Sequence, residues 1–441
     1  MSRPPRCSRR NALAALGIGG LASLAGCTTA YSALPDRASY ARTRRRSIPA
    51  VPSPVYATDE HLHDLADEIA DYAADGLEAW ERMGERERFV VYSERRLEDD
   101  LEFAETRPWE SATADTARSA RSHLWHASGA FVYATVRTDG FEGDPAAGTE
   151  QALEEAGSHL EDFEYVTDDP ATFLTYGRFL EYELQQAHSL LSHQLKADVD
   201  DRSDNTSRAE RLAEIYSTVR QGRSQIDLAT AYHDTLRERD PGGDPFGERM
   251  ANARATLRER TDELLEDRED WSGRIGEFEG NDVGESESGR RDVHDALYSR
   301  SHRGESDARS IERYVDEGYE VYGTVELATA WLVLAAARGE RDRLEAAGTD
   351  RLDSGWIDTA KRDAVDRLED LLADEPDPLT LFFAEEGRSL IYSGDRGLER
   401  SSLDDDADWQ WRQANGYARY LLAKGILGKI PDVRSLLVDG D

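Results

Sequence analysis

The chain has 441 residues, of which 39% are hydrophobic, and its 90 acidic residues against 54 basic ones give a formal net charge of -36. A chain of this length and composition can bury a sizeable core, which excludes a wholly disordered protein. The acidic balance leaves no Lys/Arg face of the kind that nucleic acids require, so we expect no nucleic-acid partner.

The basic residues are unevenly divided, because only four are lysines: Lys196, Lys361, Lys424 and Lys429. Many acids with few lysines indicate adaptation to high salt. In molar salt the Debye length falls to about 3 Å, so the repulsion between acidic side chains is largely screened. We therefore expect low salt to loosen the fold.

Residues 1–26 have the features of an export signal. Four arginines lie within the first ten residues, and residues 12–26 are uncharged and apolar. That apolar stretch is shorter than the roughly 20 residues needed to span a bilayer, which favours a cleaved signal peptide over an anchor helix. Arg9 and Arg10 precede it with only Asn11 between, as the export-directing pair of a twin-arginine signal does.

The apolar stretch closes on Leu24, Ala25, Gly26 and Cys27. Together with Arg9-Arg10, this ending resembles the signal and lipobox of twin-arginine-exported lipoproteins from halophilic archaea. The resemblance implies cleavage before Cys27, a lipid on its thiol, and attachment to the outer face of the cell membrane. Since Cys27 is then the only cysteine left, the mature chain has no intramolecular disulfide.

Residues 27–57 are expected to form a flexible tether, because prolines interrupt them and no helical or strand period is visible. The tether is basic, and its arginines have two possible roles. The arginines either contact anionic lipid headgroups or keep the tether solvated. They are Arg37, Arg42, Arg44, Arg45 and Arg46.

From residue 58 the pattern is helical. Leu62, Leu65, Ile69 and Trp80 recur at spacings that place them on one helix face, and similar runs follow to the C-terminus. We predict a single all-α domain over 58–441, either a helical bundle or an α-solenoid of helical hairpins, with about ten to twelve helices. The missing strand–helix alternation argues against a two-lobed α/β solute-binding protein.

Local signals place several helix boundaries. Asp169-Pro170 and Asp377-Pro378 each put a capping acid before a proline at the first helical position. Residues 327–337 are the most apolar stretch of the mature chain and are too short to span a bilayer, so we expect a central core helix. Turn-forming residues gather at 198–205, 240–245, 280–289 and 395–408.

Two histidine pairs are candidate metal ligands: His123 with His126, and His61 with His63. Neither pair has a zinc-binding motif or a cysteine partner, and a metal site usually needs at least three ligands. We interpret these histidines as structural or surface residues. No metal and no cofactor are expected.

Gly157, His159 and Asp162 resemble the G-x-H-x-x-E motif of imelysin-like proteins, which are exported helical modules linked to iron handling. Asp162 stands where that family has glutamate. The resemblance implies a metal-handling module and is kept as an alternative.

Glu385 and Glu386 are the best-placed pair of carboxylates for glycoside hydrolysis, with Tyr392, Trp409 and Trp411 nearby in sequence. They support a second alternative, an (α/α)-toroid carbohydrate-active enzyme. Core aromatics on an acidic surface explain them better, so no catalytic residue is assigned.

Asn205 begins an Asn-Thr-Ser sequon in a polar segment and is a candidate for glycosylation. The favoured expectation for the whole chain is a membrane-anchored, non-catalytic module that binds or organises cell-surface components. Its partners would be the membrane, through the lipid on Cys27, and an unidentified cell-surface protein or glycan.

Overall fold

Helices account for nearly all of the regular structure, as the hydrophobic periodicity predicts. The computed structural model describes residues 41–84, 91–107, 112–142, 144–195, 208–279, 288–347, 354–399 and 406–440. These residues form twelve helices of 13 residues or more, α3 to α14, and one pair of two-residue strands. The prediction of an all-α fold is confirmed.

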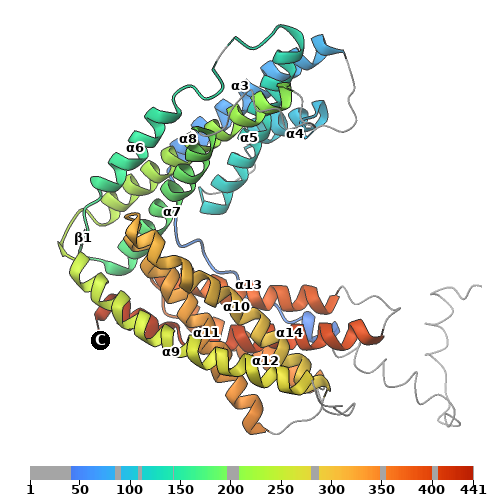
Figure 1. The fold of residues 1–441 in the computed structure, drawn as a ribbon, viewed down its shortest axis with the longest axis vertical. Coiled ribbons are helices and arrows are strands. Elements are labelled where there is room, and N and C mark those ends of the chain that lie inside the picture. Colours follow the sequence, from blue (N-terminus) through green and yellow to red (C-terminus); the bar gives the residue numbers. More distant parts are fainter. Residues whose placement is uncertain are drawn as a thin grey trace, which may run out of the picture.

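The helices form two lobes that meet at one end and diverge at the other, so that the molecule is an open V (Figure 1). The N-terminal lobe consists of α3 (Asp59–Met83), α4 (Glu94–Thr106), α5 (Ala114–Thr138), α6 (Thr149–Glu161), α7 (Pro170–Leu195) and α8 (Arg208–Arg239). The C-terminal lobe consists of α9 (Gly247–Glu279), α10 (Ser288–Asp316), α11 (Glu320–Ala347), α12 (Ser354–Leu372), α13 (Pro378–Glu399), α14 (Asp406–Leu427), α15 (Ile430–Arg434) and a π-helical turn, η1 (Ser435–Asp439).

The lobes are joined at the apex of the V by the connection between α8 and α9. There β1 (Val166–Thr167) pairs antiparallel with β2 (Asp244–Pro245). The carboxylate of Asp240 accepts a hydrogen bond from the backbone N–H of Asp168 at 3.1 Å. The turn predicted over 240–245 is confirmed, and α7 packs against α11 and α13 across the same junction.

One hydrophobic core runs from the C-terminal lobe through the junction, and a second fills the far part of the N-terminal lobe. Residues 327–337 lie in α11 and are all buried, so the expected core helix is confirmed. Among the described residues, one helix, spanning Glu320–Ala346, is long and apolar enough to cross a membrane, but 89% of its most apolar window is buried inside the protein.

Both predicted Asp-Pro helix starts are confirmed. α7 begins at Pro170, and the Asp169 carboxylate accepts the backbone N–H of Thr172 at 3.2 Å. α13 begins at Pro378, and the Asp377 carboxylate accepts the backbone N–H of Thr380 at 2.8 Å. In each case the side chain satisfies one of the N–H groups that a helix start leaves without a partner.

The turn predicted over 395–408 is wrong for most of its length. α13 continues to Glu399 and α14 begins at Asp406, so Trp409 and Trp411 lie in a helix rather than in a loop. Gly394 serves close packing, since a Cβ there would come within 2.5 Å of the Tyr420 ring. The clusters at 198–205, with Asn205, and at 280–287 lie outside the described residues.

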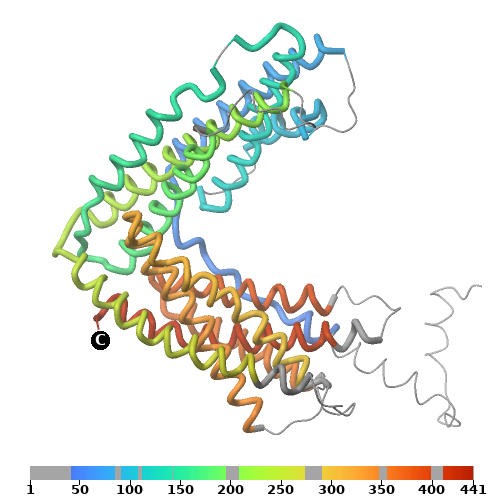
Figure 2. Tube along the Cα trace, viewed as in Figure 1, coloured from blue at the N-terminus to red at the C-terminus, as the bar shows by residue number. Residues whose placement is uncertain are grey.

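The tether expected over 27–57 is wrong for residues 41–57, which pack against both lobes. We call this segment the strap. It begins with a helical turn over residues 41–44 on the C-terminal lobe and then runs to the start of α3 on the open side of the junction (Figure 2). Residues 1–40, with Arg9, Arg10, Cys27 and Arg37, lie outside the described part, as do Leu24, Ala25 and Gly26.

Candidate functional site

The junction between the lobes holds a group of aromatic and charged side chains. Arg178 of α7 donates to the Glu326 carboxylate of α11 at 2.6 and 3.0 Å. Its guanidinium also lies 4.8 Å from the ring centre of Phe179 and 4.9 Å from that of Phe382 in α13. A cation–π contact of this partly buried kind contributes about 1–2 kcal/mol. Arg178 therefore occupies the space between these aromatic rings, and its contacts with α11 and α13 hold the two lobes together.

Glu181, one turn further along α7, is fully buried at the start of α11. Its carboxylate accepts the backbone N–H of Tyr322 at 2.7 Å, so a side chain of one lobe caps a helix of the other. Burial raises the pKa of Glu181 to about 8, although the backbone hydrogen bonds act against that rise. No sequence signal identified this residue, because its partner lies 141 positions away.

The pair His123 and His126 is joined by an acid from another helix. Asp100 of α4 lies 2.7 Å from Nδ1 of His123 and 2.5 Å from Nδ1 of His126, one carboxylate oxygen to each ring. Burial alone would raise the pKa of Asp100, but the hydrogen bonds from the two rings lower it. Because both Nδ1 atoms face Asp100, the two Nε2 atoms point away from it, and the cluster fastens α4 to α5.

His61 and His63 lie on different faces of α3 and do not meet. The His63 ring is exposed and contacts the backbone carbonyl of Asp59 at 2.6 Å. Burial, reinforced by the charge of Arg121, lowers the pKa of His61 to about 4. Across the described ranges, no group of three or more His, Cys, Asp or Glu side chains is placed to hold a metal ion.

The imelysin-like residues do not form a site either. His159 is half-buried on α6, and its Nε2 lies 3.2 Å from the Thr230 hydroxyl of α8. Asp162 is exposed at the C-terminal end of α6. The structure therefore gives His159 a contact between helices rather than a shared cation with Asp162.

Glu385 and Glu386 are each engaged with an arginine. Glu385 accepts from Arg388 of the same helix at 2.6 Å, and Glu386 accepts from Arg303 of α10 at 3.1 Å. Glycoside hydrolysis needs two carboxylates roughly 5–10 Å apart on opposite sides of a cleft, whereas these two are adjacent on one helix. Burial, with Asp115 and Glu386 adding to it, raises the pKa of Glu385 despite Arg388.

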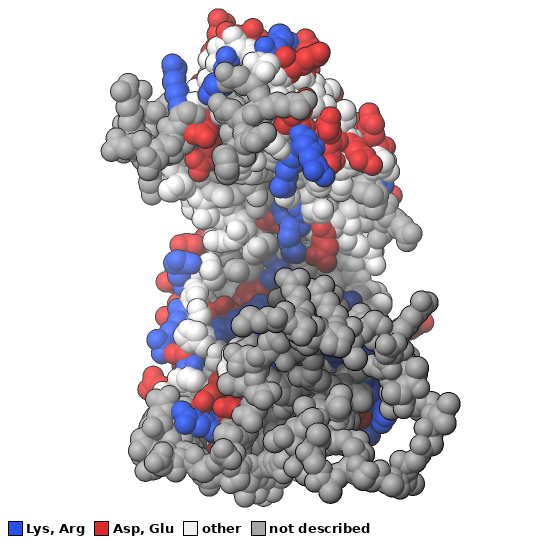
Figure 3. Space-filling model, turned by 90° about the vertical axis from the view of Figure 1, so that its right-hand side faces the viewer, with Lys and Arg blue, Asp and Glu red and all other residues white. Residues whose placement is uncertain are grey.

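The described helices also form a V rather than a closed ring, so the geometry does not support the toroid alternative. Figure 3 looks into the open side of the V, where acidic and basic side chains are interspersed on the described surface. Tyr392 and Trp411 are both 55% exposed. They come from α13 and α14.

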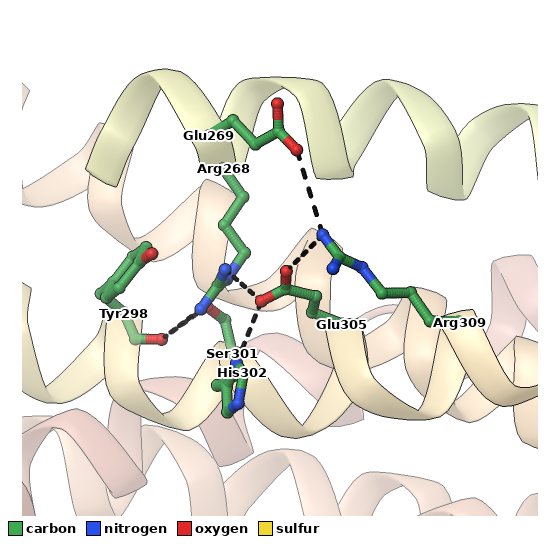
Figure 4. Close-up of polar contacts among 7 residues, drawn as sticks. All are labelled: Arg268, Glu269, Tyr298, Ser301, His302, Glu305 and Arg309. Carbon is green, nitrogen blue, oxygen red and sulfur yellow. Dashed lines mark hydrogen bonds and ion pairs between the residues drawn. The ribbon is translucent and has the colours of Figure 1, made fainter. Parts of the chain in front are cut away.

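A representative polar cluster between α9 and α10 shows how the buried charges are used (Figure 4). Arg268 donates to the Ser301 hydroxyl at 2.9 Å and lies 4.1 Å from the ring centre of Tyr298. Glu305 accepts from Arg268, and also from Arg309 at 2.7 Å. Burial would raise the pKa of Glu305, but a hydrogen bond from His302 and the two arginines lower it. Each contact in the cluster either joins α9 to α10 or joins successive turns of the same helix, so these charges serve packing between helices.

A hollow of about 660 Å³ lies between α11, α12 and α14. Trp356, Tyr417 and Leu421 give it apolar walls, and an ion pair between Lys424 and Glu340, with 3.0 Å between the charged atoms, lies at its edge. Its volume falls in the range of small-molecule sites, about 300–1,000 Å³. Its apolar walls make this hollow one place on the described surface where an apolar group of a ligand fits.

A buried lysine, Lys361, has no counterpart in the sequence predictions. It is fully buried in α12 and donates to Asp395 of α13 at 2.8 and 2.9 Å. The only sequence signal was the rarity of lysine, which gave no indication of burial.

Two family matches divide the chain where the structure does. Residues 60–242 match a family described as a domain of unknown function (DUF8262), and residues 247–439 match a second domain of unknown function (DUF8264). The first match covers the helices of the N-terminal lobe and the second those of the C-terminal lobe, so the region expected as one domain carries two matched units. No curated protein and no solved structure matches the chain.

Proposed function

We propose that the protein is a lipid-anchored, non-catalytic helical module at the outer face of the cell membrane, where it binds or organises other cell-surface components. The localisation is supported by Arg9-Arg10 and by the Leu24–Cys27 sequence. The acidic, lysine-poor composition supports a high-salt environment.

The observation that carries the non-catalytic part is the use of the polar side chains. Asp100, Glu181 and Lys361 are buried, and each bonds to a group from another helix or from the strap. Glu385 and Glu386 are paired with arginines. A catalytic side chain needs space next to its polar atoms for a reacting atom of the substrate. The polar atoms of these side chains are bonded to protein groups instead.

The imelysin-like and toroid alternatives receive no comparable support, because His159 with Asp162 and Glu385 with Glu386 do not converge on a common site. A binding role requires only a presented surface. The open V offers its inner faces, and the hollow beside Trp356 offers an apolar pocket.

Replacing the lipid-bearing residue tests the anchor. We expect Cys27→Ser to move the protein from the membrane fraction to the culture medium, because the thiol that carries the lipid is lost. Fractionation and immunoblotting of the producing cells measure this.

The chain supplies a matched control in its other cysteine. Cys7 lies within the signal peptide, so Cys7→Ser should leave the mature protein on the membrane. Retention of the Cys27→Ser protein in the membrane fraction would show that the lipobox interpretation is wrong.

A further inference from the structure

The strap is fastened to the C-terminal lobe by an unusual lysine. The Nζ of Lys361 donates to the backbone carbonyls of Thr43 at 2.8 Å and Arg46 at 3.1 Å, in addition to Asp395. Those carbonyls lie at the end of the strap's helical turn, where C=O groups lack the full set of helical partners; the Thr43 carbonyl also accepts the backbone N–H of Arg46 at 3.3 Å. The ammonium group of Lys361 therefore closes the turn and binds it to α12.

Neighbouring contacts complete this attachment. The Thr43 hydroxyl donates to Asp358 at 2.9 Å, and only 1% of Thr43 is exposed. The Tyr420 hydroxyl donates to Asp395 at 2.6 Å, which holds the carboxylate in place for Lys361. A compact ammonium can donate in three directions at once, which suits this set of carbonyls better than the planar fork of an arginine. The buried lysine in an arginine-rich chain is explained by this geometry.

The other end of the strap is fastened to the N-terminal lobe. The backbone N–H of Ala57 donates to the carbonyl of Ala112 at 2.7 Å, and that of Tyr56 donates to the Tyr176 hydroxyl at 3.4 Å. Val55 is fully buried in the core that runs through the junction. Residue 58 then caps α3, so the strap ends directly in a helix of the second lobe.

The stretch between the two attachments is short and stiff. Pro49, Pro52 and Pro54 each fix one backbone dihedral, which reduces the conformations open to the strap. Ile48 and Val51 pack against the shared core along the way. A segment of this kind holds its ends at a set separation.

We propose that the strap is a brace that sets the angle between the two lobes, with Lys361 as the residue that fastens it. The lobes are joined at the apex by the connection between α8 and α9, while the strap crosses on the open side of the junction (Figures 1 and 2). Two connections on opposite sides of a junction oppose both opening and closing. The inference stands on these contacts and does not depend on the lipid anchor.

The distance across the mouth of the V tests the brace. Spin labels are attached to Glu98→Cys in α4 and Ser389→Cys in α13, both exposed, in the full chain carrying Cys7→Ser and Cys27→Ser. Double electron–electron resonance in molar salt then gives the distribution of label separations. We expect Lys361→Met to shift and widen that distribution, because the strap loses its attachment to the C-terminal lobe.

A second variant covers the outcome in which Lys361→Met fails to fold. Five Gly/Ser residues inserted between Ser47 and Ile48 leave the Lys361 contacts intact but slacken the brace, so the same shift is expected. The matched control is Lys429→Met, since Lys429 lies over Trp331 and has no strap contact. The brace is ruled out if the slackened chain keeps the helical circular dichroism and the narrow distribution of the parent chain.

Discussion

Glu181 is a residue whose chemistry depends entirely on where the fold places it. In the unfolded chain it is an ordinary glutamate with a pKa near 4.5, whereas burial in the junction raises the pKa to about 8. Between these two values the folded chain holds a proton that the unfolded chain has released. The contribution of Glu181 to stability is therefore fully present below about pH 4.5 and is lost as the pH rises towards 8.

The substitution Glu181→Gln should remove this pH dependence, because glutamine keeps an oxygen for the Tyr322 N–H and does not ionise. Between pH 5 and 8 the free energy of unfolding of the parent chain should fall relative to the variant by up to about 1.4 kcal/mol per pH unit. Denaturant unfolding of both proteins at several pH values in molar salt measures the difference.

Glu98→Gln is the matched control, since Glu98 is exposed on α4. It should leave the pH dependence of the parent chain unchanged. Parallel stability curves for the parent chain and Glu181→Gln would mean that the buried carboxylate does not titrate in this window.

At the scale of the element, α13 shows how one capping residue fixes both the start of a helix and its place. Asp377 accepts the N–H of Thr380, and its second oxygen accepts from Arg434 of α15 at 2.5 Å. The local Asp-Pro signal was enough to place the helix start. The contact with α15 forms only because the fold brings Arg434 next to Asp377, so the Asp-Pro signal could not predict it.

Asp377→Ala should lower the free energy of unfolding by about 1–2 kcal/mol, because the first turn of α13 loses its cap and Arg434 loses its shorter ion pair, keeping only the 3.5 Å contact with Asp439. Asp374→Ala, three residues earlier and exposed, is the control and should have little effect. Thermal unfolding followed by circular dichroism compares the two. Equal losses from both substitutions would argue against a capping role.

At the scale of the whole molecule, the acidic surface and the V shape act together. Apart from Asp36, all the acidic residues behind the chain's net charge of -36 lie after residue 57, in the segment that forms the two lobes. Because the lobes share a limited junction, their acidic surfaces repel one another in dilute buffer. Arginine ion pairs, such as Arg178 with Glu326, oppose this repulsion at the junction.

Transfer from molar salt to roughly 0.1 M salt should lower the unfolding temperature, because the Debye length grows from about 3 Å to about 10 Å and repulsion extends over more of the surface. Circular dichroism melts at the two salt concentrations measure the shift. An uncharged osmolyte at matched water activity serves as the control. An unfolding temperature that does not change with salt would contradict the interpretation of the charge as a salt adaptation.

The sequence by itself determined the helical class, the start of α7 and α13, the break between α8 and α9, and the burial of residues 327–337. Each of these depends on periodicity or on residues a few positions apart, so neighbouring side chains are sufficient to fix it. The export and lipid signal likewise lies in one short stretch, and it remains a prediction. The histidine and glutamate pairs were also recognised locally, but their partners were not.

Only the tertiary structure decided the division into two lobes, the course of the strap and the partners of the buried charges. Thr43 meets Asp358 from 315 positions away, and Lys361 meets the carbonyl of Thr43 from 318. A proline-containing segment has no periodicity that reveals whether it stays free or packs on a surface. Its place is set by the complementary groups that distant helices bring to it, and those groups are assembled only when the chain folds.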